Sequence, residues 1–242
     1  MSGVSFRRCL VDFFFPPLCP LCRRVMAVNP DNGFCPECLG QMKFLTHPFC
    51  SRCGIPFGSP VGEDHLCSTC LTEERYFTRA RAVAFYEGGL AEAISRFKYQ
   101  GATHLAKPLG KLLIDYRNTG FSFSDFEVIL PTPSSRERLR DRGFNQALLL
   151  ARQVSRAHSI PLNFEALRRI RHTPPQTKLS GPEREKNIRG AFEVHRPEAV
   201  KEKHTLLIDD VLTTGATAGE CAKVLRRAGA KQVDVLTLAR AS

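Results

Sequence analysis

The sequence predicts an α/β fold, in which a mostly parallel sheet flanked by helices follows a small amino-terminal module. Two observations predict this. From residue 76 onward, short apolar runs of strand length alternate with amphipathic segments of helix length, an order typical of parallel sheets. Before residue 71 the chain holds four Cys-x-x-Cys pairs, and none follows. We therefore expect two domains, a cysteine-rich module over residues 1–75 and an α/β domain over residues 76–242.

Near its carboxyl terminus the chain contains the stretch around which the α/β domain is organised. Residues 206–208 form an apolar run suited to a strand buried on both faces, and this run ends at Asp209 and Asp210. A loop follows, and then an amphipathic helix over residues 218–227. Such a loop lies at the carboxyl end of a strand, where open α/β sheets bind ligands. Its small and hydroxylated residues are Thr213, Thr214, Gly215, Ala216 and Thr217.

These residue types indicate the ligand. The amino end of a helix favours an anion, and small residues with hydroxyl donors let the backbone curl around a phosphate. The two carboxylates repel that phosphate and suit sugar hydroxyls or hydrated Mg²⁺. 5-Phosphoribosyl 1-pyrophosphate (PRPP) combines a phosphate, a vicinal diol and a metal-bound tail. No Gly-Lys-Ser/Thr follows Gly215, which argues against a P-loop kinase. The alternative is an ordinary strand-turn-helix whose acids face water.

Composition and charge bear on the compartment and the partners. No apolar run reaches the length of a membrane span, and the start resembles a secretory signal only faintly, because Asp12 interrupts it. We therefore expect a cytoplasmic protein with reduced thiols. The formal net charge is +11, and residues 134–190 hold 13 Lys and Arg against 5 Asp and Glu. This excess indicates acidic partners such as pyrophosphate, nucleotides or nucleic acid, although a solvated basic face also fits.

The cysteine pairs predict two structural zinc centres. A Cys-x-x-Cys turn points two thiolates at one ion, and two such turns complete a tetrahedral site. If each zinc ion is bound by two neighbouring pairs, the module forms two zinc ribbons, and this arrangement is preferred. A cross-braced arrangement, in which the first pair shares an ion with the third, stays open. Disulfides are disfavoured by the compartment. The eight ligands are Cys19, Cys22, Cys35, Cys38, Cys50, Cys53, Cys67 and Cys70.

The α/β domain alternates strands and helices along the chain. Strands are expected over residues 80–86, 127–130, 191–194 and 232–238, and the second of these ends at Pro131 and Thr132. Apolar residues at helical spacing predict three helices, and Lys98 lies near the end of the first. These helices are expected over residues 90–99, 105–116 and 147–158.

The basic part of this domain indicates contacts to a ligand. Arginines at four alternate positions over residues 136–142 fit an exposed helix or a loop that faces an anion. Gly143 permits an unusual backbone turn just before the third helix. Residues 168–190 show little periodicity, which is typical of a functional lid or of disorder. Four of its polar side chains are available to close over a ligand: Gln176, Lys178, Arg184 and Asn187.

Taken in order, these motifs resemble the ComF family. They are the Cys-x-x-Cys repeats, the segment Arg142-Gly143-Phe144-Asn145-Gln146, the spacing from Gln176 to Asn187, and the segment from Asp209 to Thr217. The last segment also resembles the PRPP-binding signature of type I phosphoribosyltransferases. The resemblance covers nearly the whole chain and implies a double zinc ribbon followed by a type I phosphoribosyltransferase fold. It also implies a role in natural competence and the use of external DNA, with single-stranded DNA and a competence helicase as candidate partners.

The resulting hypothesis places Mg²⁺-PRPP on this site. Its 5′-phosphate lies on Thr213 to Thr217, Asp209 and Asp210 hold the ribose hydroxyls directly or through Mg²⁺, and its pyrophosphate lies toward Pro131 and Thr132, near Arg142 and Lys98. Transfer would pass through a ribosyl cation, with the departing pyrophosphate stabilised by Mg²⁺ and arginines.

The acceptor is not identified by any residue. A base-selective transferase needs a hood over the base, and the cysteine-rich module stands where a hood would be expected. Three classes of function stay open. The protein is a phosphoribosyltransferase, a binding protein for PRPP or single-stranded DNA without chemistry, or a DNA-binding regulator that acts through residues 1–75.

Overall fold

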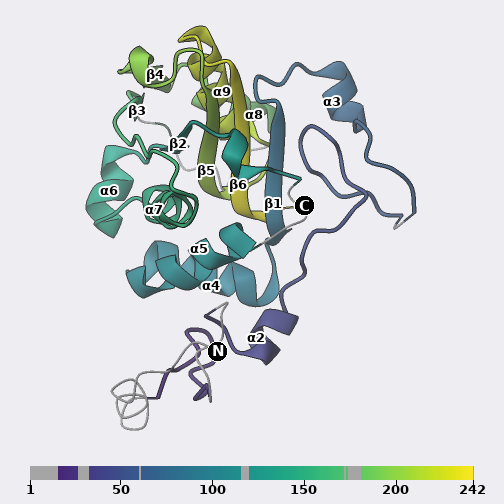
Figure 1. Ribbon diagram of the computed structural model, residues 1–242, viewed down its shortest axis with the longest axis vertical. Coiled ribbons are helices and arrows are strands. Elements are labelled where there is room, and N and C mark those ends of the chain that lie inside the picture. The colour runs from purple at the N-terminus through teal and green to yellow at the C-terminus, as the bar shows by residue number, and fades with distance from the viewer. Residues whose placement is uncertain are drawn as a thin grey trace.

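The centre of the α/β domain is a parallel four-stranded sheet (Figure 1). In this computed structural model, which describes residues 16–26, 33–59, 61–115, 120–171, 173 and 181–241, neighbouring strands follow the order β1, β6, β5, β2, and each pair is parallel. The predicted α/β class with a mostly parallel sheet is therefore confirmed. The strands are β1 (Arg79–Phe85), β2 (Val128–Pro131), β5 (His204–Leu212) and β6 (Gln232–Arg240).

Strand β5 is longer than the sequence predicted, and it includes both acids. Its ladder with β6 continues to the pair Leu212 and Arg240. Asp209 and Asp210 therefore lie within the strand, and the prediction that the strand ends at the acids is wrong. The reason is that backbone pairing with β6 holds these residues extended, whatever the polarity of their side chains.

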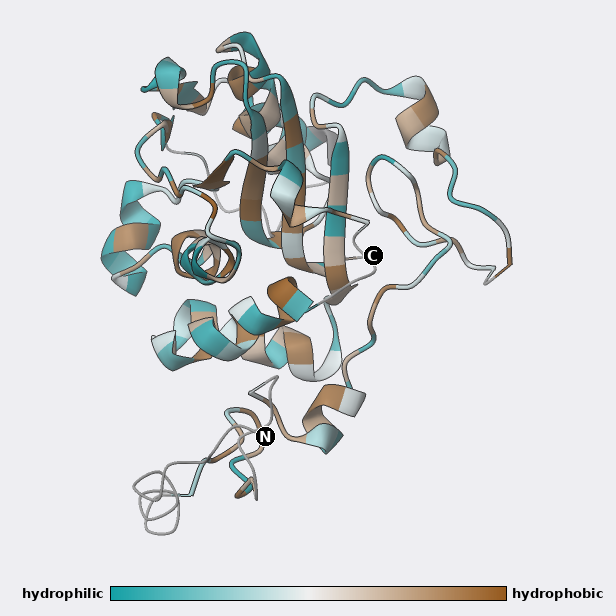
Figure 2. Ribbon diagram, viewed as in Figure 1, coloured by the Kyte–Doolittle hydropathy of each residue, from teal (hydrophilic) through white to brown (hydrophobic). Residues whose placement is uncertain are grey.

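Helices cover both faces of the sheet. On one face, α4 (Gly88–Tyr99), α5 (Ala106–Asp115) and α7 (Gln146–His158) share a core with Leu206 and Ile208 of β5. On the other, α9 (Ala216–Arg227) packs with α8 (Gly181–Ile188) in a second core that contains Leu207. Figure 2 shows hydrophobic residues concentrated on the strands between these layers. None of the helices in the described part of the chain combines the length and apolar content needed to cross a bilayer.

The described part of residues 168–190 has more regular structure than the weak periodicity of this segment indicated. Residues 172 and 174–180 lie outside the described part, but the remainder of 168–190 contributes to strand β3 and helix α8. Helix α8 packs against α9 and buries Ile188. The predicted strand at 191–194 forms as β4 and pairs antiparallel with β3, outside the main sheet. The remaining elements are α2 (Pro36–Gly40), α3 (Ser68–Thr72), α6 (Arg136–Arg142), β3 (Leu167–Arg169), β4 (Phe192–Val194) and the 3₁₀ turns Thr103–Leu105, Phe123–Asp125 and Pro197–Ala199.

The cysteine-rich module covers the edge of the sheet at β1. The Leu45 N–H donates to the Val83 carbonyl at 2.9 Å, and the Phe85 N–H donates to the Lys43 carbonyl at 2.9 Å. Near the start of the strand, the Ala80 N–H donates to the Arg52 carbonyl at 2.7 Å. These bonds satisfy backbone groups that an exposed edge would leave open. The boundary near residue 75 stays a prediction, and one core cluster contains residues from both sides of it.

Candidate functional site

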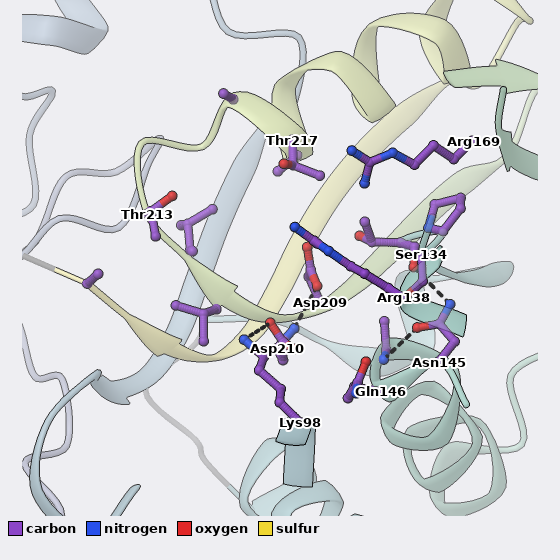
Figure 3. A pocket seen from close by; sticks show the side chains of 18 of the residues that line it. Lys98, Ser134, Arg138, Asn145, Gln146, Arg169, Asp209, Asp210, Thr213 and Thr217 are labelled. Atoms are coloured by element: carbon purple, nitrogen blue, oxygen red, sulfur yellow. Dashed lines mark hydrogen bonds and ion pairs between the residues drawn. The ribbon is translucent and has the colours of Figure 1, made fainter. Parts of the chain in front are cut away.

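A cavity of about 280 Å³ opens where β2 and β5 end, at the edge predicted for ligands (Figure 3). Its walls come from the end of β5 and the start of α9, from the segment after β2, and from α4, α6, α7 and β3. Within the described residues, none that lines it precedes Tyr86. The described part of the cysteine-rich module therefore forms no hood over this cavity, although the sequence suggested that position.

The loop after β5 forms one wall and leads directly into a helix. Gly215 is the N-cap of α9 and has a φ of 81°, a left-handed conformation that glycine adopts without strain. Thr213, Gly215, Ala216 and Thr217 line the cavity, as the phosphate hypothesis requires. Thr214 does not line it. Its carbonyl instead accepts a hydrogen bond from Arg75 Nη1 at 3.4 Å, which ties the loop to the segment before β1.

The two acids differ in their surroundings. Asp210 Oδ1 lies 2.9 Å from Lys98 Nζ, while Asp209 Oδ1 accepts the Asp210 backbone N–H at 2.8 Å. Burial and the neighbouring Asp210 carboxylate together raise the pKa of Asp209 to about 7. Burial alone would lower the pKa of Lys98, but Asp210 outweighs it and the pKa is raised. A metal or sugar hydroxyls at this place therefore meet one carboxylate already paired with an ammonium and another that gains or loses a proton near neutrality.

The turn before α7 explains why the segment from Arg142 to Gln146 has its particular sequence. Gly143 ends α6 with a φ of 78°, which confirms the unusual turn expected there. Asn145 then caps α7, because its Oδ1 accepts the Ala147 N–H at 3.0 Å. The Nδ2 of the same side chain donates to the Thr132 carbonyl at 3.0 Å. One asparagine therefore starts the helix and fixes the segment after β2, which forms the opposite wall of the cavity.

Two arginines reach into the cavity, and only Arg138 belongs to the group of four that the sequence indicated could face an anion. Arg138 comes from α6 and Arg169 from β3, and Figure 3 shows both extending toward the space above Asp209. Among the described residues, neither forms an ion pair with a carboxylate. Burial lowers the pKa of Arg169, and the charge of Arg138 lowers it further. Two guanidinium groups held together without a carboxylate partner make a binding place for an anion.

A sequence signal could have found Arg138 but not Arg169. Arg138 and Arg142 are four residues apart, so they lie on one face of a helix, and both are half-buried while Arg136 and Arg140 are exposed. Arg169 reaches the cavity because β3 pairs with β4, and that pairing has no local signature.

The remaining predicted residues have mixed outcomes. Lys98, Thr132 and Arg142 line the cavity, and the Arg142 guanidinium also lies 4.9 Å from the centre of the Tyr99 ring. Pro131 ends β2, is buried, and does not line it.

Of the four lid residues, Gln176 and Lys178 lie outside the described residues, as does the side chain of Arg184. Asn187 lies on α8 and does not line the cavity. The lid stays a prediction.

The eight cysteines form two clusters of neighbouring pairs. Within each cluster, the sulfur atoms all lie within 4.8 Å of one another. Cys22 and Cys35 sulfurs are 3.6 Å apart, and Cys53 and Cys67 sulfurs are 3.8 Å apart. Zn–S bonds of about 2.3 Å in a tetrahedron separate sulfurs by roughly 3.8 Å, so both clusters fit zinc. The arrangement is sequential, as preferred from the spacing, and the cross-braced alternative is wrong. The clusters are Cys19, Cys22, Cys35 and Cys38, and Cys50, Cys53, Cys67 and Cys70.

Comparison with known proteins matches both parts of this architecture. Residues 10–71 match the family model described as a double zinc ribbon domain, and residues 143–242 match that of a phosphoribosyl transferase domain. The chain is 33% identical to competence protein F of Haemophilus influenzae over 94% of this chain and 99% of that protein. The chain belongs to the ComF family. ComF relatives also include DNA utilization protein YhgH of Escherichia coli K12, at 34% identity over 93% of this chain and 97% of that protein. Competence protein ComFC of Bacillus subtilis is 30% identical over 90% of this chain and 88% of that protein. This ComF chain thus joins a double zinc ribbon with two Cys₄ sites to a phosphoribosyltransferase domain.

Proposed function

We propose that this ComF protein binds Mg²⁺-PRPP in the cavity at the ends of β2 and β5 and acts in the cytoplasm, in the uptake or use of DNA. The first part rests on the chemistry of the cavity. The second part rests on the names of its relatives, competence protein F and DNA utilization protein. A helicase of the competence system is the partner we propose for this role.

The observation that carries the proposal is the division of charge within one cavity. Asp209 and Asp210 stand on β5, while Arg138 and Arg169 extend over them from other elements (Figure 3). A simple anion would be repelled by the acids, and a simple cation would be repelled by the arginines. A ligand with phosphates at its ends and hydroxyls in the middle satisfies both groups, and PRPP is such a ligand.

Each wall has a role in this proposal. The loop from Thr213 to Thr217 and the start of α9 bind the 5′-phosphate through N–H and hydroxyl donors. The two acids bind the ribose hydroxyls, and Arg138 and Arg169 bind the pyrophosphate. Carboxylates are suitable ligands for Mg²⁺, which when bound would neutralise the pyrophosphate as it departs. Neither acid needs to act as a general base.

Phosphoribosyl transfer remains one of two outcomes for the bound ligand. In the first, the protein transfers the phosphoribosyl group to a base or a nucleic acid. In the second, it uses PRPP or single-stranded DNA as a ligand without chemistry. A specific observation supports a nucleic-acid ligand, because a second cavity of about 330 Å³ next to the first is lined by four arginines against two glutamates, and Ile170 beside them is exposed. These arginines are Arg136, Arg168, Arg169 and Arg171.

Calorimetry with Mg²⁺-PRPP tests the ligand assignment. The parent protein is expected to bind, and Asp209→Asn is expected to lose most of the affinity, because it removes a carboxylate without changing the shape of the side chain. Asp125→Asn is the matched control, since Asp125 is exposed and precedes β2, away from the cavity. Equal affinity of Asp209→Asn and the parent would show that the ligand assignment is wrong.

A second measurement separates the two outcomes. Pyrophosphate release is followed with PRPP and each of several bases, and then with single-stranded DNA. Release with one acceptor supports the transferase. Binding of PRPP without release of pyrophosphate supports the binding protein. If the full chain binds DNA with an affinity that falls steeply as the salt concentration rises, DNA is its second ligand.

A further inference from the structure

Two arginines of the main sheet are buried, and neither forms an ion pair with a carboxylate of the described residues. Arg81 on β1 and Arg240 on β6 are each 7% exposed. Among the described residues, neither side chain lies within salt-bridge distance of a carboxylate. A buried guanidinium is costly unless a negative group compensates its charge. For Arg81, the carboxylates of Asp64 and Asp234 supply part of that charge from beyond this distance, and the Phe49 ring centre lies 4.6 Å from its guanidinium carbon. The remaining charge calls for a further negative group in closer contact.

Both side chains reach the same turn of the zinc ribbon. Arg240 Nη1 donates to the Cys53 carbonyl at 2.7 Å, and its Nη2 lies 3.9 Å from the Cys53 sulfur. Arg81 donates to the Ser51 carbonyl at 3.0 Å and to the Cys50 carbonyl at 3.5 Å. This turn carries Cys50 and Cys53, two of the four ligands of the second Cys₄ centre.

The charges of the two groups balance. Four thiolates and one Zn²⁺ carry a net charge of about −2, which two guanidinium groups neutralise. The first centre is different. Its turn accepts hydrogen bonds from Arg96, at 3.2 Å to Pro20 and 3.1 Å to Leu21, but Arg96 is partly exposed and pairs with Glu92. In the described residues, only the second centre is contacted by buried arginines that have no carboxylate within salt-bridge distance.

The backbone of Arg240 continues from this turn to the ligand cavity. Its carbonyl accepts the Tyr86 N–H at 2.7 Å. The next residue, Ala241, donates its N–H to the Leu212 carbonyl at 2.9 Å. Tyr86, Leu212 and Ala241 all line the cavity. One residue therefore contacts the zinc ribbon through its side chain and holds part of the cavity wall through its main chain.

We propose that Arg81 and Arg240 are the counter-ions of the second zinc centre, and that Arg240 makes the shape of the ligand cavity depend on that zinc. Both are positioning residues. The counter-ion part stands on the contacts alone, whereas the link to the cavity rests on the proposed binding of PRPP.

Zinc release tests the counter-ion part. Arg81→Gln and Arg240→Gln are purified with zinc and challenged with EDTA, and the release of each equivalent is followed by mass spectrometry. Outer-shell changes typically cost about 10- to 100-fold in metal affinity. In each variant, one of the two zinc ions is therefore expected to leave about 10- to 100-fold faster than in the parent protein. Alkylation should then mark Cys50, Cys53, Cys67 and Cys70, and not the first cluster.

Three further variants control this experiment. Arg196→Gln removes an exposed arginine far from both zinc turns and should leave both release rates unchanged. Arg96→Gln should affect only the first centre. Arg240→Lys keeps the charge and should restore much of the retention, and Arg81→Gln alone carries the test if Arg240→Gln does not fold. Parental release rates in Arg81→Gln and Arg240→Gln, or in Arg81→Gln alone if Arg240→Gln does not fold, would overturn the counter-ion assignment.

Calorimetry with Mg²⁺-PRPP tests the link to the cavity. Arg240→Gln should bind PRPP about 10-fold more weakly after the labile zinc has left, and added zinc should restore the affinity. Zinc loss with parental PRPP affinity would overturn the link and leave the counter-ion part intact. If the parent protein itself does not bind PRPP, the proposed function fails and the link fails with it, while the zinc measurements still decide the counter-ion part.

Discussion

Lys98 Nζ lies 2.9 Å from Asp210 Oδ1, and the two side chains are only 15% and 14% exposed. This ion pair joins α4 to β5 at the wall of the cavity. It also means that one of the two acids is neutralised before any metal or ligand enters. Lys98 therefore belongs to the site through its contact with an acid, in addition to the pyrophosphate contact predicted from its sequence position.

Lys98→Met should weaken binding of Mg²⁺-PRPP at neutral pH. Lys98 lowers the pKa of Asp209 from what burial would give, so its loss leaves more of Asp209 protonated and unable to bind a cation. Lys98 is also predicted to contact the pyrophosphate, and a hydrogen bond to a charged group contributes about 1.5–3 kcal/mol. We therefore expect the affinity for Mg²⁺-PRPP to fall by about 10-fold or more and to recover in part at higher pH. Calorimetry between pH 6 and 9 measures this. Lys111→Met, which breaks an exposed pair with Asp115, is the control, and equal affinity in the two variants would contradict the prediction.

Arg138→Gln and Arg169→Gln should each weaken binding of inorganic pyrophosphate by about 10-fold or more, because each removes a charge-assisted hydrogen bond from the basic side of the cavity. Arg140→Gln is the matched control, since Arg140 lies on the same helix as Arg138 but is exposed and does not line the cavity. Competition of pyrophosphate with PRPP in calorimetry measures the effect. If all three variants lose affinity equally, the loss comes from net charge, and the assignment of Arg138 and Arg169 is wrong.

Local sequence was enough to predict the parts of the fold whose structure is set locally. Four Cys-x-x-Cys turns place eight thiolates, and Gly143 predicted the turn before α7, although residues 136–142 were left open between a helix and a loop. The run at residues 206–208 predicted a strand buried on both faces because its side chains are apolar at every position.

Contacts between distant segments could not be predicted in this way. Arg169 lines the cavity only because β3 pairs with β4, and the two acids belong to β5 only because β6 extends beside them. The arginines that contact the zinc turn come from strands that lie next to each other in the sheet but far apart in the chain. In each case the deciding interaction is long-range, so no window of the sequence contains it.

Gly215→Ala should reduce PRPP affinity with a limited loss of stability. The added methyl group would lie 3.7 Å from Phe77, an ordinary contact, so the cost comes from a φ of 81° and is about 1–2 kcal/mol. Relaxation of that strain would move the first turn of α9 and the loop that we propose binds the phosphate. Gly219→Ala is the control, because Gly219 lies inside α9 in open space and alanine there should stabilise by about 0.5–1 kcal/mol. Thermal unfolding and calorimetry together measure the two effects, and unchanged affinity in Gly215→Ala would contradict a role for this loop.

Binding of Mg²⁺-PRPP should strengthen as the pH rises from 6 to 8. The pKa of Asp209 is about 7, so the carboxylate that would bind Mg²⁺ or the sugar is mostly protonated at pH 6 and mostly ionised at pH 8. Calorimetry in buffers of different ionisation enthalpy should also show release of a proton on binding near pH 7. Affinity that stays constant across this range, with no proton released, would contradict the role of Asp209.

Asp209→Asn should stabilise the fold at alkaline pH while it removes ligand affinity. The pKa of Asp209 is raised on folding from 3.8 to about 7, so the folded state holds a proton that the unfolded chain gives up. The stabilisation by this proton is fully present below pH 4 and is lost as the pH rises to 7. Asparagine is neutral throughout and escapes that loss, and its melting temperature should exceed that of the parent at pH 8 by several degrees but match it at pH 4. Thermal unfolding of the parent, Asp209→Asn and the exposed control Asp125→Asn at both pH values measures this. A gain at pH 8 that also appears in Asp125→Asn would reflect net charge, whereas a gain confined to Asp209→Asn means that this acid is kept at a cost to stability, as is typical of a functional site.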